Sequence, residues 1–81
     1  MTSNPDLVMY TTPWCGYCVR LKSQLRRAGI AFAEVDIEAD PAAADVVAAV
    51  NEGNLTVPTV VFPDDSALTN PSVAQVTERA A

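Results

Sequence analysis

The chain contains no histidine and only two cysteines in its 81 residues. Without histidine a cysteine–histidine catalytic dyad is excluded, so a reactive cysteine must be activated by backbone N–H groups or by nearby cations. Two cysteines are too few for a secreted scaffold that several disulfides hold together. They are also too few for a zinc site in a monomer, and we expect no metal site. A dimeric iron–sulfur site, with one cysteine from each chain plus external thiols, stays open as an alternative.

Basic residues are also scarce, since the chain has five lysines and arginines but ten aspartates and glutamates, for a net charge of −5. This balance argues against a nucleic-acid partner, because phosphate binding needs a clustered basic surface. Four of the five basic residues lie in one segment after the second cysteine: Arg20, Lys22, Arg26 and Arg27. They avoid the apolar positions of that segment, which predicts a solvated face. Steering of acidic partners is the alternative.

Long hydrophobic runs are absent. No apolar stretch approaches the roughly 18 residues of a membrane span, and the N-terminus lacks the basic-then-apolar pattern of a signal peptide. We therefore expect no membrane association and a location in the reducing cytoplasm, where a structural disulfide would not persist. The length fits a single domain over residues 1–81, with an ordered core at about 6–80, and we expect a monomer.

Hydrophobic periodicity predicts strands that alternate with helices. The predicted elements are a buried strand at 7–11, a helix from Cys15 that Gly29 ends, a strand at 31–38, a helix that Asp40-Pro41 opens, strands at 59–62 and 67–68, and a last helix that Asn70-Pro71 opens. The apolar helix faces are Ala43, Val46, Val47 and Val50 in the second helix, and Val73 and Val76 in the last. A strand–helix–strand unit implies a parallel pair, and the close third and fourth strands imply a hairpin. The order β-α-β-α-β-β-α therefore predicts an α/β fold with a four-stranded mixed sheet flanked by three helices.

The two cysteines stand three residues apart in Trp14-Cys15-Gly16-Tyr17-Cys18, at the turn from the first strand into the first helix. A thiol attacks only as the thiolate, and the unpaired N–H groups of a helix N-terminus favour a negative sulfur there. Cys15 is therefore the expected nucleophile. Cys18 lies one turn further along, on the core-facing stripe, and is the candidate resolving thiol. Trp14 and Tyr17 flank the thiols as candidates for substrate contact, with simple packing as the alternative.

The chain resembles the glutaredoxins of the thioredoxin-fold superfamily along nearly its whole length. The resemblance rests on the Cys-Gly-Tyr-Cys motif between a strand and a helix, and on Thr56-Val57-Pro58-Thr59 before a later strand. It implies a cis peptide bond before Pro58, and it implies that Val57 offers its backbone N–H and C=O to a thiol substrate like an added strand. It also implies a redox-active Cys15–Cys18 disulfide as one state of the pair. The alternative for Pro58 is an ordinary proline at the start of a strand, with no further role. The alternative for the two cysteines is a Cys-x-x-Cys that occurs by chance.

Two departures from the glutathione-using members point to another thiol. A lysine is usual shortly before the first cysteine, where this chain has Thr12, and a Gly-Gly-x-Asp-like segment is usual where it has Leu68-Thr69-Asn70-Pro71-Ser72. Both missing features would hold the charged ends of glutathione. The neutral groups left, Thr12, Thr69 and Asn70, suit a sugar-like thiol. In these segments the chain is similar to the mycoredoxins of actinobacteria, which use mycothiol, an acetyl-cysteine joined to glucosamine-inositol.

The resemblance thus implies a thiol–disulfide oxidoreductase that removes mycothiol from S-mycothiolated proteins or small mixed disulfides by a mainly monothiol route. Mycothiol would be the reducing co-substrate, with no tightly bound cofactor. One alternative is a glutathione- or dithiol-type glutaredoxin or redoxin that donates electrons, for example to ribonucleotide reductase. The Trp-Ser-Gly-Phe stretch usual in such redoxins is absent. A thioredoxin-like domain that binds partners without catalysis is a further alternative.

Overall fold

The computed structural model describes residues 7–80; residues 1–6 and 81 of the expected domain lie outside the described part. Its elements are β1 Leu7–Thr11, α1 Gly16–Arg27, β2 Phe32–Asp36, α2 Pro41–Val50, β3 Thr59–Val61, β4 Ala67–Thr69 and α3 Val73–Ala80. The four strands form one mixed sheet in the order β2-β1-β3-β4. β1 runs parallel to β2 and antiparallel to β3, and β3 and β4 form an antiparallel hairpin. The fold class expected from the sequence is confirmed.

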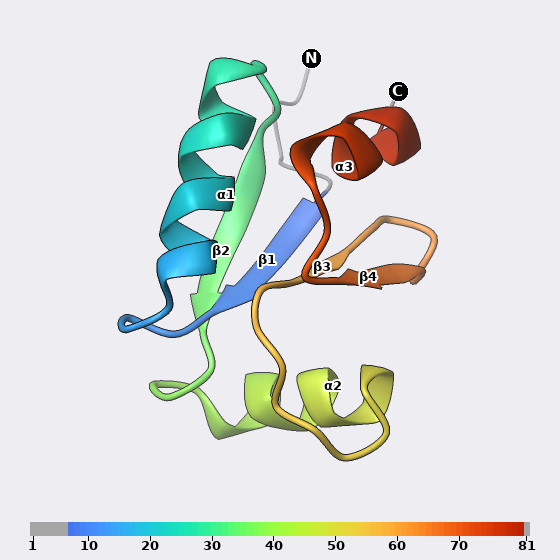
Figure 1. The fold of residues 1–81 in the computed structure, drawn as a ribbon. Helices are drawn as coiled ribbons and strands as arrows, with labels where there is room; N and C mark the ends of the chain where they lie inside the picture. Colours follow the sequence, from blue (N-terminus) through green and yellow to red (C-terminus); the bar gives the residue numbers. More distant parts are fainter. Residues whose placement is uncertain (1–6, 81) are drawn as a thin grey trace.

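Helices cover both faces of the sheet, with α1 and α3 on one face and α2 on the other (Figure 1). The larger core lies under α1 and α3 and contains Leu7, Met9, Leu21, Leu25, Val60, Phe62 and Val76. The smaller core lies under α2 and contains Ile37, Ala43 and Val47, with Tyr10, Val35 and Val57 packed against it. Alternate residues of β1 and β2 enter opposite cores, because successive side chains of a strand point to opposite faces. None of the helices in residues 7–80 is long and apolar enough to cross a membrane.

Local sequence signals explain where α1 ends and where α2 begins. α1 ends through Gly29, whose φ of +75° is easy only for glycine, while the Ile30 N–H donates to the Leu25 carbonyl at 3.0 Å. α2 begins after Asp40, whose carboxylate accepts from the backbone N–H groups of Ala42 and Ala43. Both boundaries were expected from the sequence.

Two details of the helices differ from expectation. Val46 and Val50 of α2 are 40% and 38% exposed, because the helix is rotated so that Ala43 and Val47 contact the sheet instead of the whole apolar stripe. The last helix does not open at Asn70-Pro71 but starts at Val73. There the Ser72 Oγ accepts from the Gln75 N–H and the Gln75 side chain accepts from the Ser72 N–H. This reciprocal capping box supplies the start signal, so the proline lies before the helix. The predicted inward positions of α3 are confirmed, with Val76 fully buried and Val73 packed against the larger core.

Candidate functional site: a dithiol at the N-terminus of a helix

Cys15 is the residue that caps the N-terminus of α1. Its backbone is extended, with φ −88° and ψ 110°, and its Sγ accepts a hydrogen bond from the Cys18 backbone N–H at 3.1 Å. The Cys15 N–H donates to the Thr12 carbonyl at 3.3 Å, which closes the turn between β1 and the helix. A sulfur in this place takes one of the N–H groups that a helix leaves unpaired, and the helix dipole favours negative charge there. The expected position of Cys15 at the helix start is confirmed.

Cys18 lies one turn into α1 and is more deeply buried than Cys15, with 1% of its surface exposed against 6%. Burial is the main cause that raises the pKa of the Cys18 thiol, to about 12, and its hydrogen bond with the Cys15 side chain acts in the same direction. The backbone N–H of Thr12 acts the other way but does not offset the burial. Cys18 is therefore a neutral thiol at physiological pH, and the two cysteines are chemically unequal. Both are free thiols in the structure.

This inequality predicts the alkylation behaviour of Cys18. In a Cys15→Ser variant, iodoacetamide should label Cys18 slowly at pH 8, and the rate should keep rising without a plateau below pH ~10, because a raised pKa leaves little thiolate at lower pH. The same variant unfolded in urea is the control, since its thiol should titrate near the ordinary value of 9.0. Mass spectrometry of the labelled chain at a series of pH values measures both. Equal rates at pH 8 for the folded and unfolded chains would contradict the prediction.

The segment before β3 lies against the Cys15 sulfur. The Val57–Pro58 peptide bond is cis, as the resemblance implied, and Pro58 is buried. The Cys15 thiol points at the Val57 carbonyl, with 3.9 Å between Sγ and oxygen. β1 and β3 are adjacent strands, so the sheet brings together two segments that are 42 residues apart. The Val57 backbone thus lies beside the sulfur that the sequence identified as the nucleophile.

Asn51, at the end of α2, holds the segment before β3 through hydrogen bonds. This role was not expected from the sequence. Its side-chain NH₂ donates to the Val47 carbonyl at 3.0 Å and to the Thr59 hydroxyl at 3.2 Å. The Thr59 hydroxyl, fully buried, donates in turn to the Thr56 carbonyl at 2.7 Å. Thr69, a predicted substrate contact, also donates its hydroxyl to the Asn51 side-chain oxygen. A polar residue that follows a helix was the only sequence signal for Asn51, and its side-chain partners lie in α2 itself, β3 and β4.

The two aromatic residues of the motif flank the thiols on different sides. Trp14 is 72% exposed, and its indole N–H donates to the Glu38 carboxylate at 2.6 Å, in the connection between β2 and α2. Tyr17 is 67% exposed and lies instead beside the connection between β4 and α3. Neither ring is packed in the core, so the packing alternative is wrong for both. Their exposure leaves both rings available for contact with a substrate.

Thr12 and Asn70 occupy very different environments. Thr12 is only 5% exposed, and its hydroxyl is buried without a hydrogen-bond partner among the described residues. Asn70 adopts a positive φ of 48°, and its backbone N–H donates to the Pro58 carbonyl at 2.7 Å. This bond ties the β4–α3 connection to the segment that lies against Cys15. Thr12, Asn70 and the Val57–Pro58 segment therefore all lie around the dithiol.

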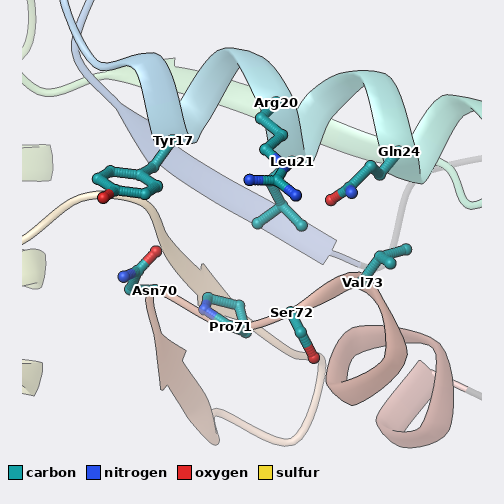
Figure 2. A pocket seen from close by; sticks show the side chains of 8 residues that line it. All are labelled: Tyr17, Arg20, Leu21, Gln24, Asn70, Pro71, Ser72 and Val73. Carbon is teal, nitrogen blue, oxygen red and sulfur yellow. The ribbon is translucent and has the colours of Figure 1, made fainter.

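A groove of about 280 Å³ runs between α1 and the β4–α3 connection (Figure 2). Its lining residues are Tyr17, Arg20, Leu21, Gln24, Asn70, Pro71, Ser72 and Val73. Arg20, Gln24 and Ser72 were not among the predicted site residues. The basic segment is thus not one uniform solvated face: Lys22 pairs with Glu34 at 2.8 Å and the Arg26 guanidinium lies over the Phe32 ring.

The family model for glutaredoxin matches residues 7–66, a span that contains both the dithiol and the Val57–Pro58 segment. The chain belongs to the glutaredoxin family. The match covers β1, both cysteines and the β3–β4 turn. Thiol–disulfide exchange is accordingly the redox chemistry of this site.

Two bacterial proteins are similar in sequence to this glutaredoxin over most of their length. A glutaredoxin of Mycobacterium tuberculosis is 60% identical over 70 residues, which cover 86% of this chain and 83% of the relative. Mycoredoxin 1 of Corynebacterium glutamicum is 38% identical over 71 residues, which cover 88% and 87% of the two chains. These likenesses confirm the resemblance to the actinobacterial mycoredoxins that the sequence motifs indicated.

Solved structures agree with the fold of this glutaredoxin. The crystal structure of Methanosarcina acetivorans methanoredoxin superimposes with a TM-score of 0.77 at 26% identity, covering 89% of this chain and 80% of the other. The glutaredoxin of Methanosarcina mazei Go1 gives a TM-score of 0.79 at 22% identity, covering 91% and 76%. At 22% identity, the likeness to the Methanosarcina mazei protein concerns the fold alone. Within residues 7–80 of this chain, no three Cys, His, Asp or Glu side chains gather as a metal site would require.

Proposed function

We propose that this glutaredoxin removes mycothiol from mixed disulfides, with Cys15 as the nucleophile and mycothiol as the reductant. The arrangement that supports the nucleophile is the Cys15 sulfur at the helix N-terminus, 3.1 Å from the Cys18 N–H and directed at the Val57 backbone. A substrate sulfur in line with Cys15 would place its own chain along Val57, where an extended peptide can add hydrogen bonds like another strand. In this proposal the enzyme is a single-domain monomer over residues 1–81 that acts in the cytoplasm.

The reaction balances as two successive thiol–disulfide exchanges. The Cys15 thiolate attacks the mycothiol sulfur of protein–S–S–mycothiol, the old S–S bond breaks, and the target thiolate leaves and takes up a proton. Cys15 is then joined to mycothiol by a new S–S bond. The thiolate of a second mycothiol attacks that bond at the mycothiol sulfur, which releases mycothiol disulfide and regenerates the Cys15 thiolate. The net reaction converts the mixed disulfide and one free mycothiol into the protein thiol and mycothiol disulfide, so the free mycothiol is the reductant.

The environment of Cys18 favours this monothiol route. Resolution by Cys18 would need its thiolate, and burial, the main cause that raises the Cys18 pKa, disfavours that thiolate. The backbone N–H of Cys18, by contrast, donates to the Cys15 sulfur whatever the state of the Cys18 side chain. In our proposal Cys18 therefore supports the nucleophile through its backbone, and the Cys15–Cys18 disulfide is a side branch.

The Trp14–Glu38 hydrogen bond is the observation that carries the choice of thiol. It holds a carboxylate beside the residue that precedes Cys15, and Trp14 follows by two residues the Thr12 position where the resemblance places the lysine of glutathione-using members. The neighbouring Thr12 is neutral and buried. An anionic thiol with two carboxylates meets repulsion there, whereas a neutral sugar thiol meets none. The likeness to a protein named mycoredoxin supports the same choice.

We expect kcat/KM to be at least tenfold higher for a mycothiolated peptide than for the same peptide carrying glutathione. In a Glu38→Gln variant the value for the glutathionylated peptide should rise about two- to fivefold, since loss of a close like charge in water is worth about 1 kcal/mol or less. Appearance of the free peptide thiol, followed by chromatography at low salt, measures both effects. Glu78→Gln on α3 is the matched control and should change nothing. A wild-type preference for glutathione would overturn the choice of mycothiol.

A further inference from the structure

The segment that faces the Cys15 sulfur has little burial to hold it in place. Residues 52–56 are exposed, and Val57 is half-buried against the smaller core. The Val57 carbonyl lies 3.9 Å from the Cys15 Sγ. A misplacement of about 1 Å at a reacting centre can lower a rate about 10²-fold. Hydrogen bonds therefore decide how accurately this segment lies against the nucleophile.

The bonds that hold the segment flank Val57 on both sides. On one side, the Thr59 hydroxyl donates to the Thr56 carbonyl at 2.7 Å. On the other side, the Asn70 backbone N–H donates to the Pro58 carbonyl at 2.7 Å. Neither bond uses the Val57 carbonyl, which faces the nucleophile. The segment is thus held through the neighbours of the residue on which a substrate chain would dock.

Both flanking bonds lead back to one side chain, the amide of Asn51 at the end of α2. Its NH₂ donates to the Thr59 hydroxyl at 3.2 Å, and that hydroxyl donates onward to the Thr56 carbonyl. The Asn51 oxygen accepts from the Thr69 hydroxyl at the end of β4, one residue before the second flanking donor. The NH₂ also donates to the Val47 carbonyl at 3.0 Å, which fixes the amide to the last turn of α2.

The junction of α2, β3 and β4 needs the particular chemistry of an asparagine. This side chain supplies two N–H donors and an acceptor oxygen from one planar group. An aspartate has the same shape but no donor, so it would repel the Val47 carbonyl and attract the Thr59 hydroxyl away from Thr56. An alanine would leave the Thr59 and Thr69 hydroxyls without this partner. Either change should loosen the segment before β3.

We propose that Asn51 is a positioning residue for thiol–disulfide exchange, which holds the Val57 backbone where an incoming substrate chain can bond to it beside Cys15. This inference rests on the docking along Val57 in the proposed function, and it deepens that function by naming the group that holds the docking edge. Asn51 bonds a backbone carbonyl and two hydroxyls, and neither sulfur is among its partners. Its effect should therefore fall on substrates with backbone amides beside the disulfide, and not on the reactivity of the Cys15 thiolate.

The kinetic test compares two symmetrical disulfides that differ in their backbone amides. N-acetylcysteine amide disulfide has an amide N–H and a C=O beside each sulfur, whereas hydroxyethyl disulfide has neither. In a parent chain that carries Cys18→Ser, the Cys15 thiolate attacks one sulfur, a new S–S bond joins the two, and the other thiolate leaves and takes up a proton. Mass spectrometry of the intact chain after timed quenching gives the rate constant. Neither disulfide contains mycothiol, so the result does not depend on the choice of thiol.

The parent chain should favour the amide disulfide about tenfold beyond the ratio that a free thiol gives, because the Val57 backbone can exchange two hydrogen bonds with it. Asn51→Ala should remove most of this advantage and leave the rate with hydroxyethyl disulfide unchanged. Thr59→Val should act in the same way, since it removes the hydroxyl that reaches the Thr56 carbonyl. Thr59→Ser keeps a hydroxyl and should retain the advantage.

Asn54→Ala is the matched control from the same turn. Asn54 is exposed and donates to the Asn51 backbone carbonyl, so its loss leaves the Asn51 amide in place. This variant should keep the full advantage for the amide disulfide. Loss of the advantage in Asn54→Ala would overturn the inference, because the turn as a whole and not the Asn51 amide would then be responsible.

The remaining outcomes separate this inference from the proposed function. An unchanged advantage in Asn51→Ala would overturn the inference, and so would an equal loss on both disulfides, which would mean a general effect on the fold or on the nucleophile. A parent chain without any advantage would defeat the docking along Val57 in the proposed function, and the inference with it. If circular dichroism shows that Asn51→Ala does not fold, Thr59→Val and Thr59→Ser make the same comparison.

Hydrogen exchange provides a second readout that needs no substrate. The Asn70 N–H bonds the Pro58 carbonyl, so its exchange rate reports how firmly the segment is held. In Asn51→Ala this rate, measured by NMR, should rise about tenfold. The Ile30 N–H, which donates to the Leu25 carbonyl at the end of α1, should exchange at the wild-type rate. Equal acceleration at both amides, or none at Asn70, would overturn the proposal.

Discussion

Replacement of Cys15 by serine is expected to abolish disulfide exchange, with a loss of roughly 10³-fold or more in turnover of a mycothiolated peptide. The serine keeps the N-cap position, so the helix should still form, but a hydroxyl there cannot attack the disulfide as a thiolate does. The remaining thiol, Cys18, is 1% exposed, and its burial is the main cause that raises its pKa, so it should not take over the attack. Release of the peptide thiol, followed under reducing conditions with mycothiol, measures the loss.

Cys18→Ser is the matched control and should keep much of the activity. The change leaves the residue-18 backbone N–H, which donates to the Cys15 sulfur, in place. The variant should also trap the Cys15–mycothiol adduct, because the competing intramolecular disulfide is no longer possible. Mass spectrometry of the intact chain detects that adduct. Equal losses in the two variants would defeat the monothiol scheme and show that both sulfurs take part in each turnover.

Leu25→Ala should cause a large loss of stability. Leu25 is fully buried on α1 and packs in the larger core against both the sheet and α3. Its truncation leaves a cavity and should lower the free energy of unfolding by about 3 kcal/mol, with a fall in Tm of about 15 °C in a chain of this size. Thermal unfolding by circular dichroism, with both thiols reduced, measures the change. α1 carries the dithiol at its N-terminus, so its packing on the sheet also positions the site.

Val19→Ala provides the comparison on the same helix. Val19 is 56% exposed, and its truncation should change the free energy of unfolding by no more than about 0.5 kcal/mol. A loss as large as that of Leu25→Ala would mean that the Val19 side chain packs in a core, because alanine has the higher intrinsic helix preference and cannot weaken the helix by itself. Such a result would contradict the assignment of the larger core.

Much of the fold was predictable because its signals are local. The change from a strand pattern to a helical one at Cys15, Gly29 after α1, and Asp40-Pro41 before α2 are each read within a few residues. The order of the elements then limits the topology, since a strand–helix–strand unit gives a parallel pair. The start of α3 was misplaced for the same kind of reason. Two possible helix starts, Asn70-Pro71 and the Ser72–Gln75 capping box, are adjacent in the sequence. The helix begins at the capping box because Ser72 and Gln75 form reciprocal hydrogen bonds.

The functional site likewise has features that the local sequence predicts and others that it does not. The sequence by itself determined the dithiol, the unequal positions of its sulfurs at a helix start, and the presence of a Thr-Val-Pro segment. Only the tertiary structure decided that Val57 lies against Cys15, that the Thr69 hydroxyl turns to Asn51, and that Arg20 lines a groove with Asn70. The physical reason is that each of these contacts joins segments distant in the chain, through side chains whose direction depends on how the helices pack on the sheet. Local periodicity sets which face of an element is apolar, but the neighbouring elements decide which polar groups meet.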